Sequence, residues 1–93
     1  MKKYEAMYII RPTLDEEARK AIIEELNATF TNNGSTVSEV KEWGLRDLAY
    51  EIDGETKGYY VLLNVEATTE AVNEYDRVCK IKENVIRHII VVA

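Results

Sequence analysis

The sequence predicts an α+β domain in which a hairpin joins two strand–helix–strand halves. Three observations support this prediction. Four stretches are rich in β-branched, aromatic and other apolar residues, two further stretches carry apolar residues at helical spacing, and glycine or proline stands at the boundaries. Their order is strand, helix, strand, strand, helix, strand. This order is typical of a four-stranded antiparallel sheet with both helices on one face, the ferredoxin-like plan.

The first half begins with a strand over residues 4–10, which becomes wholly apolar at its end, as a central strand does. Pro12 ends it because proline has no N–H for the ladder. Thr13 is expected to cap a helix, with Glu16 completing a capping box, and an apolar stripe at helical spacing follows. Gly34 suits the left-handed conformation that closes such a helix.

The middle of the chain predicts a long hairpin. Residues 36–52 are expected to form one strand that bends at Gly44, because glycine tolerates the backbone of a bulge. A polar loop over residues 53–58 then leads to a second central strand over residues 59–65. The bent strand is therefore expected at one edge of the sheet.

A second helix and a last strand complete the chain. Thr68 or Thr69 can cap the helix, whose apolar positions run as far as Cys79, and residues 84–92 are expected to form the strand. In the ferredoxin-like plan the first and third strands lie at the centre. The second and fourth are then edges, which need protection or a partner.

Composition bounds the class of protein. The 93 residues are expected to form one domain, residues 1–93, with 46% apolar and 31% charged residues, as in an ordinary globular chain. The start of the chain is too polar for a signal peptide, and no apolar run approaches the roughly 20 residues of a membrane span. We therefore expect a cytoplasmic protein. The lone Cys79 is interpreted as a small core residue.

Four segments give the chain a resemblance to one family. Residues 42–52 read as an acidic residue, Trp, Gly, Leu and Arg, followed by Leu-Ala-Tyr and an isoleucine two places on. Residues 3–5, 58–59 and 80–87 agree in order and interval. The chain resembles protein six of the bacterial small ribosomal subunit over almost its whole length. The resemblance implies a ribosome-bound structural protein without enzymatic activity or cofactor.

Charge is distributed unevenly along the chain. The formal net charge is −5, but residues 77–93 hold four basic side chains against one acidic, a balance of +3. A local basic patch can act on nucleic acid because distant acids are screened at physiological salt. The resemblance implies contact with the central domain of small-subunit rRNA. The residues expected to contact this RNA are Lys2, Lys3, Arg77, Lys80, Lys82, Arg87 and His88.

A second surface is expected on the bent strand. An edge strand that carries an aromatic residue and an arginine has the composition of an interface hot spot. The resemblance implies that this edge receives the eighteenth protein of the small subunit, a small basic chain that would complement an acidic surface. Asp47 and Glu51 stand where many members of the family have a basic residue and a proline. The expected interface residues are Trp43, Gly44, Leu45, Arg46, Leu48 and Tyr50.

Other classes find less support in the residues. The single histidine, His88, is expected on the surface of its strand, and no metal-ligand cluster or glycine-rich phosphate loop is present. Residues 57–59 begin like the base-stacking strand of an RNA-recognition motif, but Tyr60 and Val61 break the pattern. We expect no membrane and no small-molecule substrate. Two alternatives remain: a small regulatory or ligand-binding ferredoxin-like domain that forms a homodimer, and an enzyme of the acylphosphatase kind, although residues 11–14 do not supply the glycine loop that such an enzyme uses to bind an anion.

Overall fold

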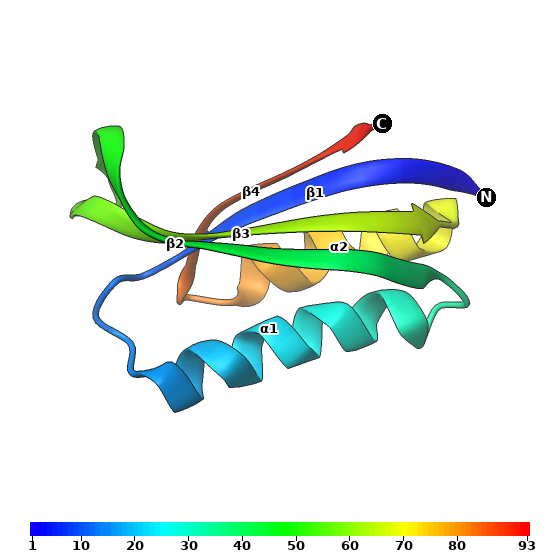
Figure 1. The fold of residues 1–93 in the computed structure, drawn as a ribbon, viewed down its shortest axis with the longest axis horizontal. Helices are drawn as coiled ribbons and strands as arrows, with labels where there is room; N and C mark the ends of the chain where they lie inside the picture. The colour runs from blue at the N-terminus through cyan, green and yellow to red at the C-terminus, as the bar shows by residue number, and fades with distance from the viewer.

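The computed structural model describes residues 1–93 and has the predicted order of elements (Figure 1). The four strands pair antiparallel in the order β2-β3-β1-β4, and both helices pack against one face of the sheet. The α+β, ferredoxin-like β-α-β-β-α-β fold is therefore confirmed, with β2 and β4 at the edges. The elements are β1 (Lys2–Ile10), α1 (Glu16–Thr31), β2 (Thr36–Ile52), β3 (Glu55–Ala67), α2 (Thr69–Ile81) and β4 (Val85–Val92).

Alternation along the strands separates the two faces of the sheet. On β1 the even-numbered residues Ala6, Tyr8 and Ile10 belong to the core beneath the helices. Met7 and Ile9 point to the other face, because successive side chains of a strand alternate. Leu26 and Phe30 of α1 and Tyr75 of α2 are the largest helix residues in the core. None of the helices is long and apolar enough to cross a membrane.

The first helix starts later than predicted. Asp15 is its N-cap and accepts a hydrogen bond from the backbone N–H of Ala18 at 2.8 Å. The capping box expected from Thr13 and Glu16 is therefore wrong, because aspartate caps a helix as well as threonine does and stands next to the first helical residue. Thr68 caps α2, as one of the two predicted alternatives, through a hydrogen bond from Ala71 N at 3.1 Å.

The hairpin between β2 and β3 is longer and tighter than predicted. Only Asp53 and Gly54 form its turn, both with positive φ (51° and 81°), the combination of a type I′ turn. The loop predicted over residues 53–58 is wrong, because polar residues pair equally well where both faces of a hairpin meet water. Gly44 has φ 86°, and the register of β2 shifts between Glu42 and Gly44. The predicted bulge is therefore confirmed.

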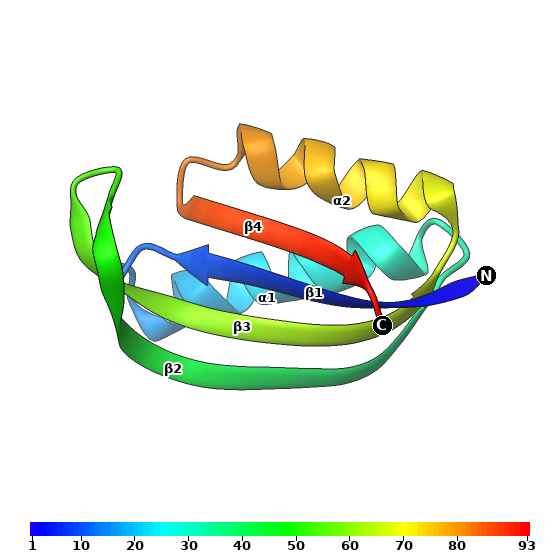
Figure 2. The same cartoon turned by 90° about the horizontal axis from the view of Figure 1, so that it is seen from above.

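Beyond this bulge the hairpin leaves the plane of the sheet. Figure 1 shows its end rising on the side opposite the helices, and Figure 2 shows it turning across the end of β1 toward β4. The face of the sheet that no helix covers, which we call the open face, is therefore partly walled by the hairpin. The candidate site lies there.

Candidate protein and RNA interfaces

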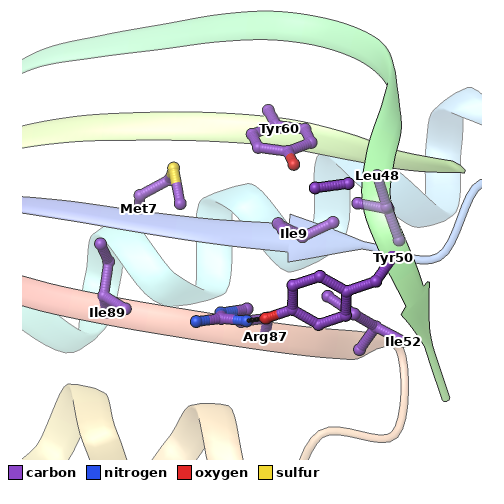
Figure 3. Close-up of a pocket in the computed structure, with 9 residues that line it drawn as sticks. Met7, Ile9, Leu48, Tyr50, Ile52, Tyr60, Arg87 and Ile89 are labelled. Carbon is purple, nitrogen blue, oxygen red and sulfur yellow. Dashed lines mark hydrogen bonds between the residues drawn. The ribbon is translucent and has the colours of Figure 1, made fainter.

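A groove lies between the hairpin and the open face. It has a volume of about 200 Å³, and eight of its nine lining residues are hydrophobic. Strands β1, β3 and β4 supply its floor, and the hairpin supplies its wall (Figure 3). The lining residues are Met7, Ile9, Leu48, Ala49, Tyr50, Ile52, Tyr60, Arg87 and Ile89.

A close approach between β1 and β3 shapes this groove. A Cβ atom placed on Gly58 would lie 2.2 Å from Cγ2 of Ile9 and 3.4 Å from Cδ2 of Leu48. The absence of a side chain at Gly58 thus lets Ile9 and Leu48 come together over β3. Gly58 and Ile9 are far apart in the sequence, and the register between β1 and β3 brings them next to each other.

An aromatic pair extends the groove along β2. The ring of Trp43 stacks on the ring of Tyr60, with centroids 6.5 Å apart and an interplanar angle of 15°. Because Tyr60 also lines the groove, Trp43 and the groove form one continuous apolar surface. Trp43 is 48% exposed although it is the largest apolar side chain of the protein. We call Trp43, Tyr60 and the groove the apolar surface.

The structure brings together some of the six residues expected at the protein interface. Trp43, Leu48 and Tyr50 belong to the apolar surface, with Gly44 at the bulge that turns the strand. Leu45 is exposed and faces Tyr59, which packs on the helix side of the sheet, whereas Trp43 stacks on Tyr60 of the open face. The bulge at Gly44 thus places two residues that alternation would put on the same face on opposite faces. Arg46 donates from Nε to the carbonyl of Trp43 at 3.3 Å.

Sequence reasoning missed most of the apolar surface. Met7 and Ile9 on β1, Tyr60 on β3 and Ile89 on β4 line the groove but were not among the expected interface residues. One signal could have identified them. Near the hairpin, both alternating sets of residues on these strands contain apolar side chains, whereas the predicted plan covers only one face of the sheet with helices. An apolar second face is therefore expected to bind something.

Arg11 fixes the tip of the hairpin. Its guanidinium contacts the Asp53 carboxylate, donates to Glu55 Oε2 at 3.3 Å, and donates from Nε to the carbonyl of Glu83 at 3.0 Å. The hydrogen bond with Asp53 raises the pKa of Arg11 above its ordinary value, so the side chain stays charged. Arg11 therefore ties the hairpin to the connection between α2 and β4.

The seven residues expected to contact RNA do not form one cluster. Arg77 pairs with Glu74, Lys80 Nζ lies 2.9 Å from Asp76 Oδ2, and Lys82 Nζ lies 2.6 Å from Glu25 Oε2. The sequence hides the last of these pairs because the two residues belong to elements far apart in the chain. Each basic side chain near the end of α2 thus has an acidic neighbour.

Arg87 and His88 point to opposite faces of the sheet, because consecutive strand residues alternate. Arg87 lies on the open face and donates to the hydroxyl of Tyr50. His88 lies against α2, where Nε2 is 2.7 Å from Asp76 Oδ1 and its ring meets Tyr75 edge-on. Its side chain is only 17% exposed, so the expectation of a surface histidine is wrong.

Asp76 is the acceptor for two of these basic groups. Hydrogen bonds from His88 and then Lys80 hold the pKa of the Asp76 carboxyl below its ordinary value. The carboxylate remains ionised at neutral pH and neutralises part of the basic charge of α2 and β4. The net positive charge of this surface is therefore smaller than the count of basic residues in the sequence suggests.

Lys2 and Lys3 form a separate group at the other end of the sheet. Both are exposed, and neither has an ion pair within the chain. They lie near the start of α2, because Lys2 faces Ala67 on β3 and α2 begins two residues later (Figure 2). Lys80 and Lys82 lie at its far end, so the two basic groups are about 20 Å apart, the length of 13 helical residues at 1.5 Å each.

A ferredoxin-like domain with an apolar, partly walled open face is a small binding module in its architecture. The family described as Ribosomal protein S6 matches residues 3–92. Among solved structures, the crystal structure of 30S ribosomal protein S6 from Thermotoga maritima superposes with a TM-score of 0.94. The two sequences are 24% identical, and the match covers 99% of this chain and 87% of that one, which shows the shared fold.

This chain belongs to the ribosomal protein S6 family. The family consists of structural proteins of the small ribosomal subunit, not enzymes, and the resemblance identified from four segments of the sequence is confirmed.

Proposed function

We propose that this protein binds the central domain of small-subunit rRNA together with the eighteenth protein of the small subunit, and that it does so in the cytoplasm on the assembling ribosome. The observation that carries the proposal is the apolar surface around Trp43, on a chain whose family match spans residues 3–92. A structural protein of the ribosome needs surfaces for its neighbours. The apolar surface is suited to a protein and the basic groups to RNA.

The protein partner docks on the apolar surface and the hairpin. Trp43 and Tyr50 are 48% and 62% exposed, although both are large side chains with mostly apolar surface. Tryptophan and tyrosine are enriched among the residues that dominate binding energy. The hairpin residues 42–55 include five acidic side chains and one basic. This balance suits a basic partner, because complementary charge speeds association and selects the partner.

The RNA contacts come from lysine and arginine side chains along α2 and at the start of β1. Four of the expected residues are exposed: Lys2, Lys3, Arg77 and Lys80, whereas the Lys82 side chain is only 22% exposed. Arg77 and Lys80 have acidic neighbours, but exposed ion pairs contribute only about 0–1 kcal/mol, so a phosphate can replace the acid. His88 is covered and contributes by fixing Asp76.

The protein-binding surface and the basic groups act together when the partner protein is bound to the same RNA. An acidic protein with few free basic groups binds RNA poorly by itself. A partner that is already on the RNA raises its effective concentration there, and affinity increases without any new contact. We therefore expect RNA binding to depend on the eighteenth protein.

Binding of a central-domain rRNA fragment, measured with and without the eighteenth protein across a salt series, tests the proposal. The expected result is tight binding only with the partner, weakening as salt rises. A folded chain that binds in neither case contradicts the proposal. A concentration-dependent dimer by light scattering in that case would support the regulatory homodimer instead.

Two variants separate the surfaces. Trp43→Ala is expected to weaken binding of the eighteenth protein about 30-fold, the effect of losing roughly 2 kcal/mol at a hot spot. Ile81→Ala is the control, because Ile81 is 65% exposed and lies outside the apolar surface. Equal effects of the two changes would rule out Trp43 as the anchor.

For the RNA surface, Lys80→Gln combined with Lys82→Gln is compared with Lys20→Gln, an exposed lysine of α1 without an ion pair. The double variant is expected to reduce the slope of log affinity against log salt by roughly 0.7–0.9 for each phosphate that the protein no longer neutralises. A slope unchanged from that of Lys20→Gln would exclude this end of α2.

A further inference from the structure

The hairpin segment that carries Leu48 and Tyr50 lacks regular pairing with its own partner strand. Asp47 faces Lys57 and Ile52 faces Glu55, and the register shifts between these two pairs. Residues 48–51 therefore have no facing partners on β3. Regular pairing with β3 aligns most of the rest of β2, and side-chain contacts add to what holds residues 48–51 over the open face.

Arg87 supplies one of these contacts from the opposite edge of the sheet. It lies on β4, where it faces Ile9 of β1, and its Nη1 donates to the hydroxyl of Tyr50 (Figure 3). The carbon of its guanidinium is 6.0 Å from the centre of the Tyr50 ring. The contact joins residues 37 apart in sequence and crosses the groove. Arg11 holds the tip of the same hairpin at Asp53 and Glu55.

We infer that Arg87 is a positioning residue of the protein-binding groove, and that it holds the wall formed by residues 48–51 in place instead of contacting RNA phosphate. The inference rests on the proposed function, because it assigns Arg87 to the protein surface of that function. An arginine suits this task better than a lysine, since its planar guanidinium can donate to the hydroxyl and lie near the ring at once.

The expected role is to preorganise the groove. If the wall moves away, the partner must order it on binding, and affinity falls although Arg87 itself makes no required contact with the partner. The guanidinium of Arg87, which donates to the Tyr50 hydroxyl, is also less available to a phosphate of the RNA. Loss of Arg87 should therefore weaken protein binding and leave the salt dependence of RNA binding unchanged.

The first test uses the free chain. Hydrogen exchange of the backbone amides of residues 48–52 is measured in the wild type, in Arg87→Ala and in Arg77→Ala. Arg77 is a matched control, because it is an exposed arginine that pairs with Glu74 on α2. Faster exchange at residues 48–52 in Arg87→Ala alone is expected. Equal exchange in all three proteins would overturn the inference whether or not the partner binds.

The second test is a double-mutant cycle on binding of the eighteenth protein. Arg87→Ala and Tyr50→Phe are each expected to weaken binding about tenfold, the effect of one hydrogen bond to a charged group. The double variant should be no weaker than Arg87→Ala alone, because both changes remove the same contact. Additive effects would overturn the inference.

RNA binding in the presence of the partner completes the test. The salt slope of Arg87→Ala should equal that of the wild type. A slope smaller by roughly 0.7–0.9, with protein binding unchanged, would make Arg87 a phosphate contact and overturn the inference while leaving the proposed function standing. A wild-type chain that binds neither partner would contradict the proposed function, an outcome distinct from the exchange result.

Discussion

The two faces of the sheet are built from the same strands but differ in what covers them. On β3, Leu63 faces the helices and is fully buried, whereas its neighbour Leu62 faces the open side and is half-buried. On β4, His88 bonds to Asp76 of α2, whereas its neighbour Arg87 bonds to the hairpin. Neighbouring residues of one strand thus have different roles, because one stabilises the core and the next shapes the binding surface.

This difference indicates how a chain of 93 residues can be stable and still offer an apolar surface for binding. The helix-covered face contains the single core, and burial of its apolar side chains is the main term that offsets chain entropy. The open face is apolar mainly in the groove near the hairpin, and no helix covers it. Its apolar area contributes most when a partner removes it from water, so mutations on the two faces should separate stability from binding.

The sharpest separation is expected from adjacent leucines. Leu63→Ala should lower the free energy of unfolding by about 2–5 kcal/mol, because it leaves a cavity beneath the helices. Leu62→Ala should cost only about 1 kcal/mol, since this side chain is half-buried before any partner binds. Urea denaturation of both variants measures the difference. Equal reductions would mean that the open face is packed in the free chain as tightly as the core.

Gly58→Ala should disturb the packing of the open face, because the added methyl group would clash with Ile9. The added Cβ of Gly58→Ala would lie 2.2 Å from Cγ2 of Ile9, a stiff β-branched side chain that cannot move aside freely. The expected loss in unfolding free energy is about 1–3 kcal/mol. Ile9→Ala removes the clashing methyl group. The double variant should therefore lose less than the sum of the two single changes, and simple additivity in urea unfolding would contradict the packing.

Two tyrosines allow a comparison within the helix-covered face. Tyr75 and Tyr8 are both fully buried. The hydroxyl of Tyr75 lies 3.1 Å from the carbonyl oxygen of Met7 and 3.3 Å from that of Ile89, whereas the Tyr8 hydroxyl has no hydrogen-bond partner. Burial raises the pKa of both phenols, so both stay neutral.

Tyr75→Phe should therefore cost about 1 kcal/mol, because it leaves buried carbonyl oxygens without their donor. Tyr8→Phe should be neutral or stabilising, since it removes a buried polar atom that nothing satisfies. Thermal unfolding at neutral pH measures both changes, and Tyr50→Phe on the hairpin is the control from the open face. A larger loss for Tyr8→Phe than for Tyr75→Phe would contradict the hydrogen-bond assignment.

The fold was predictable because its signals are local. Apolar runs, caps and Gly44 lie within a few residues of the elements they define, and the resemblance to the family added their order. The start of α1 was missed because Thr13 and Asp15 are both good caps and only the packed structure selects one. The turn at Asp53 and Gly54 was missed because polar residues after it pair without showing an apolar pattern.

The candidate site was less predictable because its contacts join distant parts of the chain. Trp43 and Tyr50 stood out as exposed aromatic residues of an edge strand. Nothing local indicates that Arg87 reaches Tyr50, or that Lys82 pairs with Glu25. A count of basic residues in sequence cannot tell which of them already have acidic neighbours. The apolar part of the open face, by contrast, could have been inferred from Met7 and Ile9 on β1 and Tyr60 and Leu62 on β3, which the predicted helices leave uncovered.

The smallest expected effect concerns Asp76 and the pH dependence of stability. Its pKa is held below the ordinary value of 3.8 in the folded chain, first by the hydrogen bond from His88 and then by Lys80. A carboxyl whose pKa is lower in the folded state contributes stability above its unfolded pKa and loses it as pH falls through the folded value. Asp76→Asn should therefore lower the urea midpoint at pH 7, and the difference from the wild type should shrink as pH falls below 3.8.

Asp47→Asn is the control for this change. Asp47 lies on the hairpin, its side chain is 85% exposed, and its ion pair with Lys57 is long, at 3.9 Å. Exposed pairs of this kind contribute little, so the control should leave the midpoint at pH 7 almost unchanged. If Asp47→Asn lowered the midpoint as much as Asp76→Asn, the stabilising polar contacts would not be confined to the helix-covered face.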